Sequence, residues 1–209
     1  NSVITLTGDR SISTTNTNIT LDEVLTNTNN DHVLSLTAGS GNIVIDDNLG
    51  ANGGNVLGGL TIVSAGDVTL SGAAATADLG ATSGLTVTSA SGDVEFDAAV
   101  NSAGAIDINT ATLTLDAAMT TTGGVNITIT NSGTAALNAL VTSAGSTTFD
   151  GAGAITLGAN IVSAGLVSVA NSVITLTGDR SISTTNTNIT LDEVLTNTNN
   201  DHVLSLTAG

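Results

Sequence analysis

Val125-Asn126-Ile127-Thr128-Ile129-Thr130 alternates aliphatic with polar residues, and Leu85-Thr86-Val87-Thr88 shows the same alternation. Alternation of apolar and polar residues with a period of two indicates a β-strand with one buried and one hydrated face. The spacing that an amphipathic helix needs is nowhere sustained along the chain. The sequence therefore predicts a protein built from short β-strands.

The strands fall into segments that can be aligned with one another. Seven segments align: Asn42–Asp47, Asp67–Gly72, Asp93–Ala98, Thr112–Ala117, Thr134–Ala139, Ala154–Ala159 and Val173–Gly178. Their second positions are all apolar: Ile43, Val68, Val94, Leu113, Ala135, Ile155 and Ile174. Their fourth positions are apolar too: Ile45, Leu70, Phe96, Leu115, Leu137, Leu157 and Leu176. Four residues further on, another apolar column runs through Val100, Met119, Val141 and Ile161. Like residues are expected to stack, with a further strand completing each rung.

This stacking predicts an all-β fold, a right-handed parallel β-helix in which three strands make one rung. Small-residue turns punctuate the strands, and Ser-Ala-Gly recurs at 64–66, 102–104, 143–145 and 163–165. The expected rungs are 32–59, 60–84, 85–104, 105–124, 125–145, 146–165 and 166–201. Seven rungs spaced by about 4.8 Å would span roughly 34 Å.

The chain also repeats on a longer scale, because residues 1–39 recur without a substitution as residues 171–209. Residues 1–170 are therefore one full repeat unit of about seven rungs, and 171–209 start the following unit. A perfect long repeat is typical of a tandem array. We expect a single continuous solenoid, and the absence of an initiator Met at Asn1 suggests a window from a longer polymer.

Composition excludes several classes of partner. The net charge is −16, with 18 Asp and Glu against two Arg and no Lys, so a phosphate-binding basic surface is missing and nucleic acid is excluded as a partner. No apolar run is long enough to span a membrane as a helix. The chain has no Cys, no Pro, no Trp and no Tyr, which suits a narrow and regular interior.

Acidic residues supply the candidate metal site. Asp93, Glu95 and Asp97 alternate on one outward strand face, and in the stacked arrangement Asp97 neighbours Asp116, with Asn138 beyond. Oxygen ligands suit Ca²⁺, so Asp93, Asp97, Asp116 and Asn138 form a possible calcium ladder. The plainer interpretation is a solvated acidic face screened by salt. Acid/base hydrolysis is disfavoured, because no sugar-binding aromatic residue accompanies the carboxylates.

The segment from Thr177 to Asp201, a copy of Thr7 to Asp31, lengthens the last rung, so we expect it to leave the solenoid as a loop. Loops on a regular scaffold are common places for binding. Its candidate residues for lateral contacts are Arg180, Asp192, Glu193 and Asp201. The alternative is a surface bulge without function. A second protrusion is expected at residues 46–59, and His32 and its copy His202 are expected to be surface residues.

Outward threonine pairs leave one more function class open. Thr-x-Thr occurs at Thr86/Thr88, Thr112/Thr114 and Thr128/Thr130. Flat threonine ladders can order water and bind ice, although outward threonines are common in β-solenoids of other functions.

Three rungs carry a resemblance to a known family: Ser-Ala-Gly-Asp-Val-Thr-Leu-Ser-Gly (64–72), Ser-Gly-Asp-Val-Glu-Phe-Asp-Ala (91–98) and Gly-Ala-Ile-Thr-Leu-Gly-Ala (153–159). They resemble the degenerate G-[DN]-[IV]-x-[LF] repeats of filamentous haemagglutinin-like and giant long-repeat bacterial adhesins. The resemblance covers essentially the whole chain. It implies secretion across a Gram-negative envelope, display as a rod at the cell surface, and attachment to cells or neighbouring fibres. It brings no catalytic residue.

The repeat and the composition together favour a structural, non-enzymatic function: an extracellular fibre or adhesin shaft, with no cofactor other than a possible calcium ion. Expected partners are copies of the chain along and between fibres, and cell-surface or matrix glycans or proteins. A calcium-stabilised or ice-binding solenoid is the alternative. A polysaccharide-acting β-helix enzyme is favoured less, because duplicating a large unit is a poor route to one active site.

Overall fold

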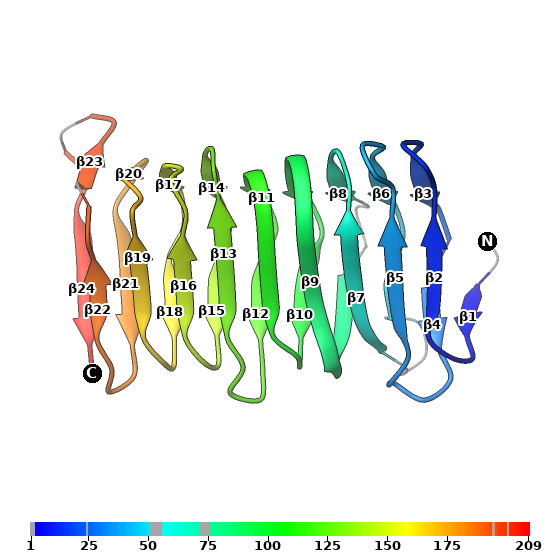
Figure 1. Ribbon diagram of the computed structural model, residues 1–209. Coiled ribbons are helices and arrows are strands. Elements are labelled where there is room, and N and C mark those ends of the chain that lie inside the picture. Colours follow the sequence, from blue (N-terminus) through cyan, green and yellow to red (C-terminus); the bar gives the residue numbers. More distant parts are fainter. Residues whose placement is uncertain (1–2, 24, 51–55, 72–75, 194, 200) are drawn as a thin grey trace.

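A computed structural model describes residues 3–23, 25–50, 56–71, 76–193, 195–199 and 201–209 (Figure 1). These residues form strands and turns without a helix, and the strand pairings are parallel. Successive turns of the chain lie side by side along one axis, with the N-terminal strands at one end of the body and the C-terminal strands at the other (Figure 1). The fold is a parallel β-helix, as the sequence predicts.

The strands stack in three columns, and the chain visits column 1, column 2 and column 3 in turn. Column 1 contains β2 (Arg10–Ser13), β5 (Val33–Thr37), β7 (Leu57–Ser64), the middle of β9 (Thr76–Phe96), the start of β11 (Ile106–Leu115), β13 (Ile127–Asn131), β16 (Thr147–Asp150), β19 (Val167–Ala170) and β22 (Ile189–Leu191). Column 2 contains β3 (Ile19–Leu21), β6 (Ile43–Ile45), β8 (Val68–Leu70), the ends of β9 and β11, β14 (Ala135–Leu137), β17 (Ile155–Leu157), β20 (Ile174–Leu176) and β23 (Leu195–Asn197).

Column 3 is built from the shortest strands. It contains β1 (Ile4–Leu6), β4 (Leu25–Asn27), the start of β9, β10 (Ala99–Ser102), β12 (Met119–Thr121), β15 (Val141–Ser143), β18 (Ile161–Ser163), β21 (Arg180–Thr184) and β24 (Leu204–Ala208). A bridge at Leu49 joins β4 to Ala77 at the start of β9. The described chain thus makes about nine turns.

The core is the set of inward residues that stack from one turn to the next. In column 2 the predicted register is confirmed, because Val94 pairs with Leu113, Leu113 with Ala135, and Ala135 with Ile155. The column of Val100, Met119, Val141 and Ile161 is confirmed in column 3. These side chains are buried and belong to one continuous hydrophobic cluster. Each turn therefore covers the apolar surface of the turn beneath it, which is the main source of stability.

The number of residues per turn varies along the chain, whereas the register between paired strands is kept. One turn takes 26 residues from Val68 to Val94 but 19 residues from Val94 to Leu113. The variation is absorbed at the corners, where small residues allow close approach. Gly84 illustrates this requirement, because its φ is +67° and a Cβ there would overlap the carbonyl oxygen of Ala105 on the next turn.

The segment from Thr177 to Asp201 corrects the predicted organisation. We expected it to leave the solenoid as a loop, but it contributes β21, β22 and β23, which pair with β18, β19 and β20. Its strands are only three to five residues long and are separated by Thr- and Asn-rich turns, so their alternation was mistaken for loop sequence. The predicted rung 166–201 therefore contains more than one turn, and a 170-residue unit holds more than seven rungs.

The predicted protrusion at residues 46–59 is partly wrong. Leu49 is buried and bridges Leu25 and Ala77, and Leu57 begins β7. Residues 51–55 lie outside the described residues, so the prediction of a protrusion there is not addressed.

A ladder of buried hydroxyl groups lines the corner after column 3, and the sequence pattern did not predict it. It consists of Ser102, Thr121, Ser143, Ser163 and Thr184. Each hydroxyl donates to a main-chain carbonyl of the corner; for example, Ser143 Oγ lies 3.1 Å from the oxygen of Ser146, and Ser163 Oγ lies 2.7 Å from the oxygen of Gly145. Because buried polar groups must be paired, this ladder fixes where each turn bends. It also explains the serine of three of the Ser-Ala-Gly turns.

Replacing Ser143 by Ala removes the hydroxyl that donates to Ser146 and accepts from the main-chain N–H of Gly145. We expect the free energy of unfolding to fall by about 1–3 kcal/mol, because buried partners are left unpaired. The neighbouring outward variant Thr142→Ala is the control and should change stability by no more than about 0.5 kcal/mol. Urea unfolding measures both, and equal effects of the two variants would contradict a structural role for the ladder.

Candidate functional site

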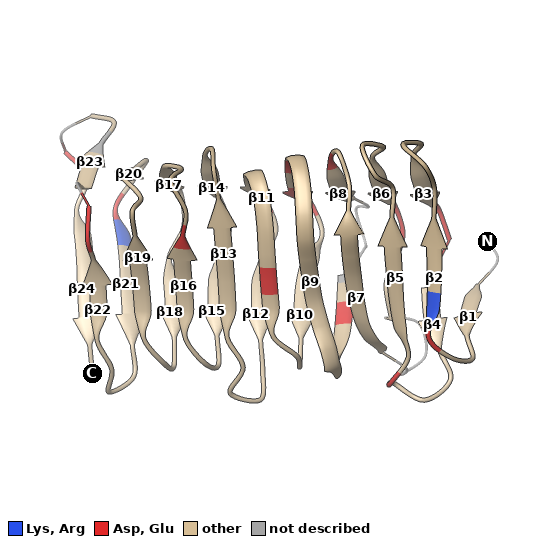
Figure 2. Cartoon of the chain, viewed as in Figure 1, with Lys and Arg blue, Asp and Glu red and all other residues tan. Residues whose placement is uncertain are grey.

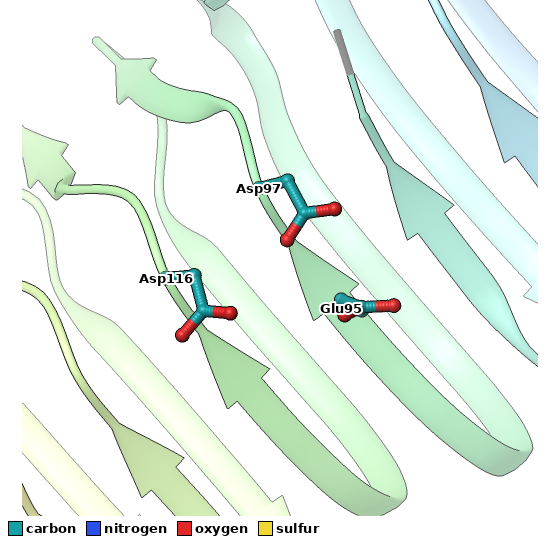
Figure 3. A group of neighbouring side chains, drawn as sticks. All are labelled: Glu95, Asp97 and Asp116. Atoms are coloured by element: carbon teal, nitrogen blue, oxygen red, sulfur yellow. The ribbon is translucent and has the colours of Figure 1, made fainter. Parts of the chain in front are cut away.

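Three carboxylates meet on the outer face of column 2, where strand stacking brings them together. Glu95 lies on β9 opposite Thr114 of β11, and Asp97 and Asp116 follow the two strands at equivalent positions. One oxygen from each residue lies within 4.8 Å of the others, and the three side chains project from neighbouring turns (Figure 3). This carboxylate cluster of Glu95, Asp97 and Asp116 is the group of possible metal ligands found among the described residues.

The cluster differs from the predicted calcium ladder by one member at each end. Asp97 and Asp116 lie together, as expected from the stacked turns. Asn138 contacts Asp116, but its Nδ2 donates to Asp116 Oδ1 over 2.7 Å, so the amide contributes its N–H and not its oxygen. Glu95 joins the cluster where Asp93 was predicted to do so. The alternation of Asp93, Glu95 and Asp97 was the signal that could have placed Glu95 there.

Mutual repulsion dominates the electrostatics of the cluster. Asp97 raises the pKa of the Glu95 carboxyl, and burial, Asp116 and Asp93 raise this pKa further. Glu95 is half-buried, whereas Asp97 and Asp116 are exposed. Ca²⁺ takes about six to eight oxygen ligands, so an ion held on this open face would keep much of its water. We therefore expect the carboxylates to act mainly by repelling one another, which any dissolved cation relieves.

A ladder of side chains precedes the column 2 strands and ends at the main chain of Asp93. Asn18 Oδ1 accepts the main-chain N–H of Asn42 (2.9 Å), and Asn42 Oδ1 accepts that of Asp67 (3.0 Å). Asp67 Oδ1 in turn accepts the N–H of Asp93 (3.0 Å), so the aligned segments that begin at these two aspartates stack as expected. Each side chain satisfies a donor on the next turn. Asp93 is thus placed by a structural hydrogen bond.

The residues predicted for lateral contacts are spread over the last two turns. Arg180 lies in β21, Asp192 and Glu193 follow β22, and Asp201 lies between β23 and β24. Asp192, Glu193 and Asp201 are exposed. The structure therefore distributes these residues along the solenoid and does not gather them in one loop.

Arg180 takes part in a turn that the first copy of the repeat reproduces. Its Nη1 donates to the carbonyl oxygen of Asp179 (2.7 Å), and Arg10 Nη1 donates to that of Asp9 (2.8 Å). The preceding aspartate also has the same role in both copies, because Asp179 Oδ1 accepts the N–H of Val203 and Asp9 Oδ1 accepts that of Val33. The repeated sequence thus folds locally in the same way at both ends of the chain.

The two histidines lie beside the preceding aspartates. His32 Nδ1 is 3.2 Å from Asp31 Oδ1, and His202 Nδ1 is 3.3 Å from Asp201 Oδ1. Figure 2 shows the carboxylates scattered along the whole body, with the two arginines near its opposite ends.

The outward threonines of the predicted pairs do not form an unbroken ladder. On column 1, Thr86 and Thr128 are separated by Asp107 of the intervening turn. On column 2, Thr114 lies between Glu95 and Ala136. Elsewhere the outward hydroxyls stack without interruption, as for Thr156, Thr175 and Thr196 on column 2, so ice binding stays an alternative prediction.

Comparisons with known proteins leave the family open, since no family model, no curated protein and no solved structure matches this chain. The described residues also contain no helix long and apolar enough to cross a membrane.

The carboxylate cluster makes stability depend on pH in a defined direction. Because the pKa of Glu95 is higher in the folded chain, the folded state binds this proton more tightly than the unfolded state does. The free energy of unfolding should therefore fall as the pH rises from the ordinary glutamate range through the raised pKa. Glu95→Gln should be more stable than the original chain at neutral pH by less than about 1 kcal/mol.

This advantage of Glu95→Gln should vanish below about pH 4, where the carboxyl is protonated in both states. Asp107→Asn is the control, because Asp107 lies between two threonines on column 1. Urea unfolding at acid and neutral pH measures the difference. A Gln variant that is less stable than the original chain at neutral pH would count against repulsion at this site.

The effect of different salts on the melting temperature distinguishes general screening of the carboxylates from specific binding of calcium. We expect NaCl and CaCl₂ at equal ionic strength to raise the melting temperature by similar amounts, because exposed charges are screened by any electrolyte. If Ca²⁺ alone raises it at low concentration, and if Asp97→Asn with Asp116→Asn abolishes this rise, the ladder predicted from sequence binds calcium after all.

Proposed function

We propose that this chain is a segment of a structural shaft, an extracellular fibre or adhesin stalk that grows by adding identical β-helix units. The observation that carries the proposal is a comparison of the two copies of the 39-residue repeat. Residues that are exposed in one copy are buried in the other, where a further turn covers them.

At the N-terminal end of the body, the first copy lacks a turn on its outer side. Ile12 is 38% exposed there, whereas its copy Ile182 is fully buried between β18 and β24. Ile4 and Ile12 also line an open apolar hollow of about 320 Å³. In the second copy a preceding turn occupies the equivalent position, and this supports the proposal of a tandem array.

At the C-terminal end the relation is reversed. Leu206 is 51% exposed, whereas its copy Leu36 is fully buried between β2 and β7. Each of these residues is buried in the copy that has a turn on both of its sides, and exposed in the copy that has a turn on one side only. A tandem array would therefore present no open core between units, and each added unit would contribute length and stability.

The surface supports a role in contact and not in chemistry. The outward residues are mainly Thr, Ser, Asn and Asp, which donate to and accept from the hydroxyls of glycans or the main chain of other proteins. The resemblance of the Gly-Asp-Val-Thr-Leu type rungs to adhesin repeats supports export and display at a bacterial surface. Partners would be further copies along and between fibres, and glycans or proteins of cells or matrix.

The two copies provide a matched test of the stacking. Leu36→Ala should lower the free energy of unfolding by about 2–5 kcal/mol, because it leaves a cavity in the core. Leu206→Ala changes the identical residue of the other copy and should cost well under half as much, because its side chain is already half in water. Urea unfolding compares them, and equal losses would mean that the covering turn does not bury the residue.

Electron microscopy of the native material tests the shaft itself. Filaments of uniform width are expected, whereas compact particles of one size would argue against the proposal.

A further inference from the structure

We infer that successive units of the shaft are rotated by two thirds of a turn, so that any outward group returns to the same column only in every third unit. This inference rests on the proposed tandem array. It follows from the columns that the two identical copies occupy within this one chain.

The copies do not occupy the same faces. In the first copy, β1 lies in column 3, β2 in column 1 and β3 in column 2. In the second copy, the identical sequences form β20 in column 2, β21 in column 3 and β22 in column 1. Every strand of the repeat is therefore displaced by the same step around the axis.

The size of the step follows from counting turns. From β2 to β19, column 1 advances through seven successive pairings. The chain then continues through β20 in column 2 to β21 in column 3, and β21 is the copy of β2. One repeat unit thus contains seven turns and two thirds of another, and only three units make a whole number of turns.

Local pairing is unaffected by this rotation. Arg10 pairs with Leu34 in column 1, and Arg180 pairs with Leu204 in column 3. Ile4 likewise pairs with Leu25 in column 3, and Ile174 with Leu195 in column 2. The sequence of a strand therefore fixes the strands on which it stacks, while the number of strands before it fixes its face.

The same strand fits two different columns because its inward residues meet the same partners in each. In the copies of β2 and β21, an isoleucine pairs with a leucine on the next turn, Ile12 with Leu36 and Ile182 with Leu206. At the following corner, Thr14 Oγ1 donates to the oxygen of Thr17, and Thr184 Oγ1 donates to that of Thr187. The same hydroxyl turn thus closes two different corners of the helix.

The rotation determines how a shaft presents its surface. The carboxylate cluster lies on column 2 here, so it would lie on column 1 in the next unit and on column 3 in the one after. Neighbouring clusters would be about 37 Å apart along the axis, and clusters on one face about 110 Å apart, for turns spaced by about 4.8 Å. Such separations exceed the screening length of roughly 8 Å at physiological salt, so the clusters do not repel one another. A second shaft could then make the same lateral contact on any of three sides.

Cysteine pairs in the full chain test the rotation, because the chain has no cysteine of its own. In the rotated arrangement Thr190 of β22 lies beside Ser168 of β19 on the outer face of column 1. If the second copy instead kept the columns of the first, β21 would stack on β19 as the copy of β2, and Ser181, the copy of Ser11, would lie beside Ser168. Neighbouring positions on adjacent turns have the Cα separation that a disulfide requires.

We expect Ser168→Cys with Thr190→Cys to lose two hydrogens on mild oxidation, as seen by mass spectrometry, and Ser168→Cys with Ser181→Cys to remain reduced. Thr20→Cys with Val44→Cys should also link, which places the first copy of the same strand in column 2. Thr128→Cys with Thr148→Cys is the control, because both residues precede the second copy and neighbour in column 1 in both arrangements.

The reverse pattern, with Ser168 linked to position 181 and not to position 190, overturns the rotation but leaves the tandem shaft intact. Failure of both Ser168 pairs, with the control pair linked, also overturns the rotation. Failure of the shaft itself would appear elsewhere, as equal losses of stability in Leu36→Ala and Leu206→Ala.

Discussion

In-register parallel stacking of one turn on the next is the interaction on which the whole structure depends. Main-chain N–H groups of one turn donate to carbonyls of its neighbour, as between Ile127 and Ser146 (2.9 Å) or Met119 and Leu140 (3.0 Å). These bonds hold equivalent side chains one above another, so an aliphatic residue covers an aliphatic residue. Because each turn contacts only its two neighbours, stability grows with the number of turns. The interior is mainly aliphatic, with Phe96 and Phe149 as its two buried rings.

The same stacking places like polar groups together on the outside, with two different results. Where the stacked groups can pair, as in the ladder from Asn42 to Asp67, they satisfy main-chain donors and stabilise the corner. Where only carboxylates meet, as at Glu95 and Asp97, they repel and shift a pKa upward. A fold built on repetition therefore tolerates an acidic surface only if the acids are dispersed or screened.

The mismatch that we infer between the repeat of the sequence and the turn of the helix sets the face on which each carboxylate cluster of a tandem array lies. A 170-residue unit that held a whole number of turns would line up every carboxylate cluster on one face. Two thirds of a turn distributes them over three faces, while the local pairing of each strand stays the same. The repeat fits different columns because its strands keep the same partners in both copies, as with Ile12 and Leu36 or Ile182 and Leu206.

The sequence by itself determined the strands, the inward columns and the register, since these depend on alternation and on partners about 20 residues away. Pairings such as Val94 with Leu113 and Met119 with Val141 follow from the alignment of sequence segments alone. Only the tertiary structure decided that residues 177–201 form strands, because three-residue strands such as Ile189–Leu191 are stabilised by the turn beneath them and not by their own pattern. It also decided that Glu95 rather than Asp93 faces Asp97 and Asp116, and on which face each copy of the repeat lies. Those outcomes depend on side-chain hydrogen bonds between turns and on the total count of strands, which no single stretch of sequence contains.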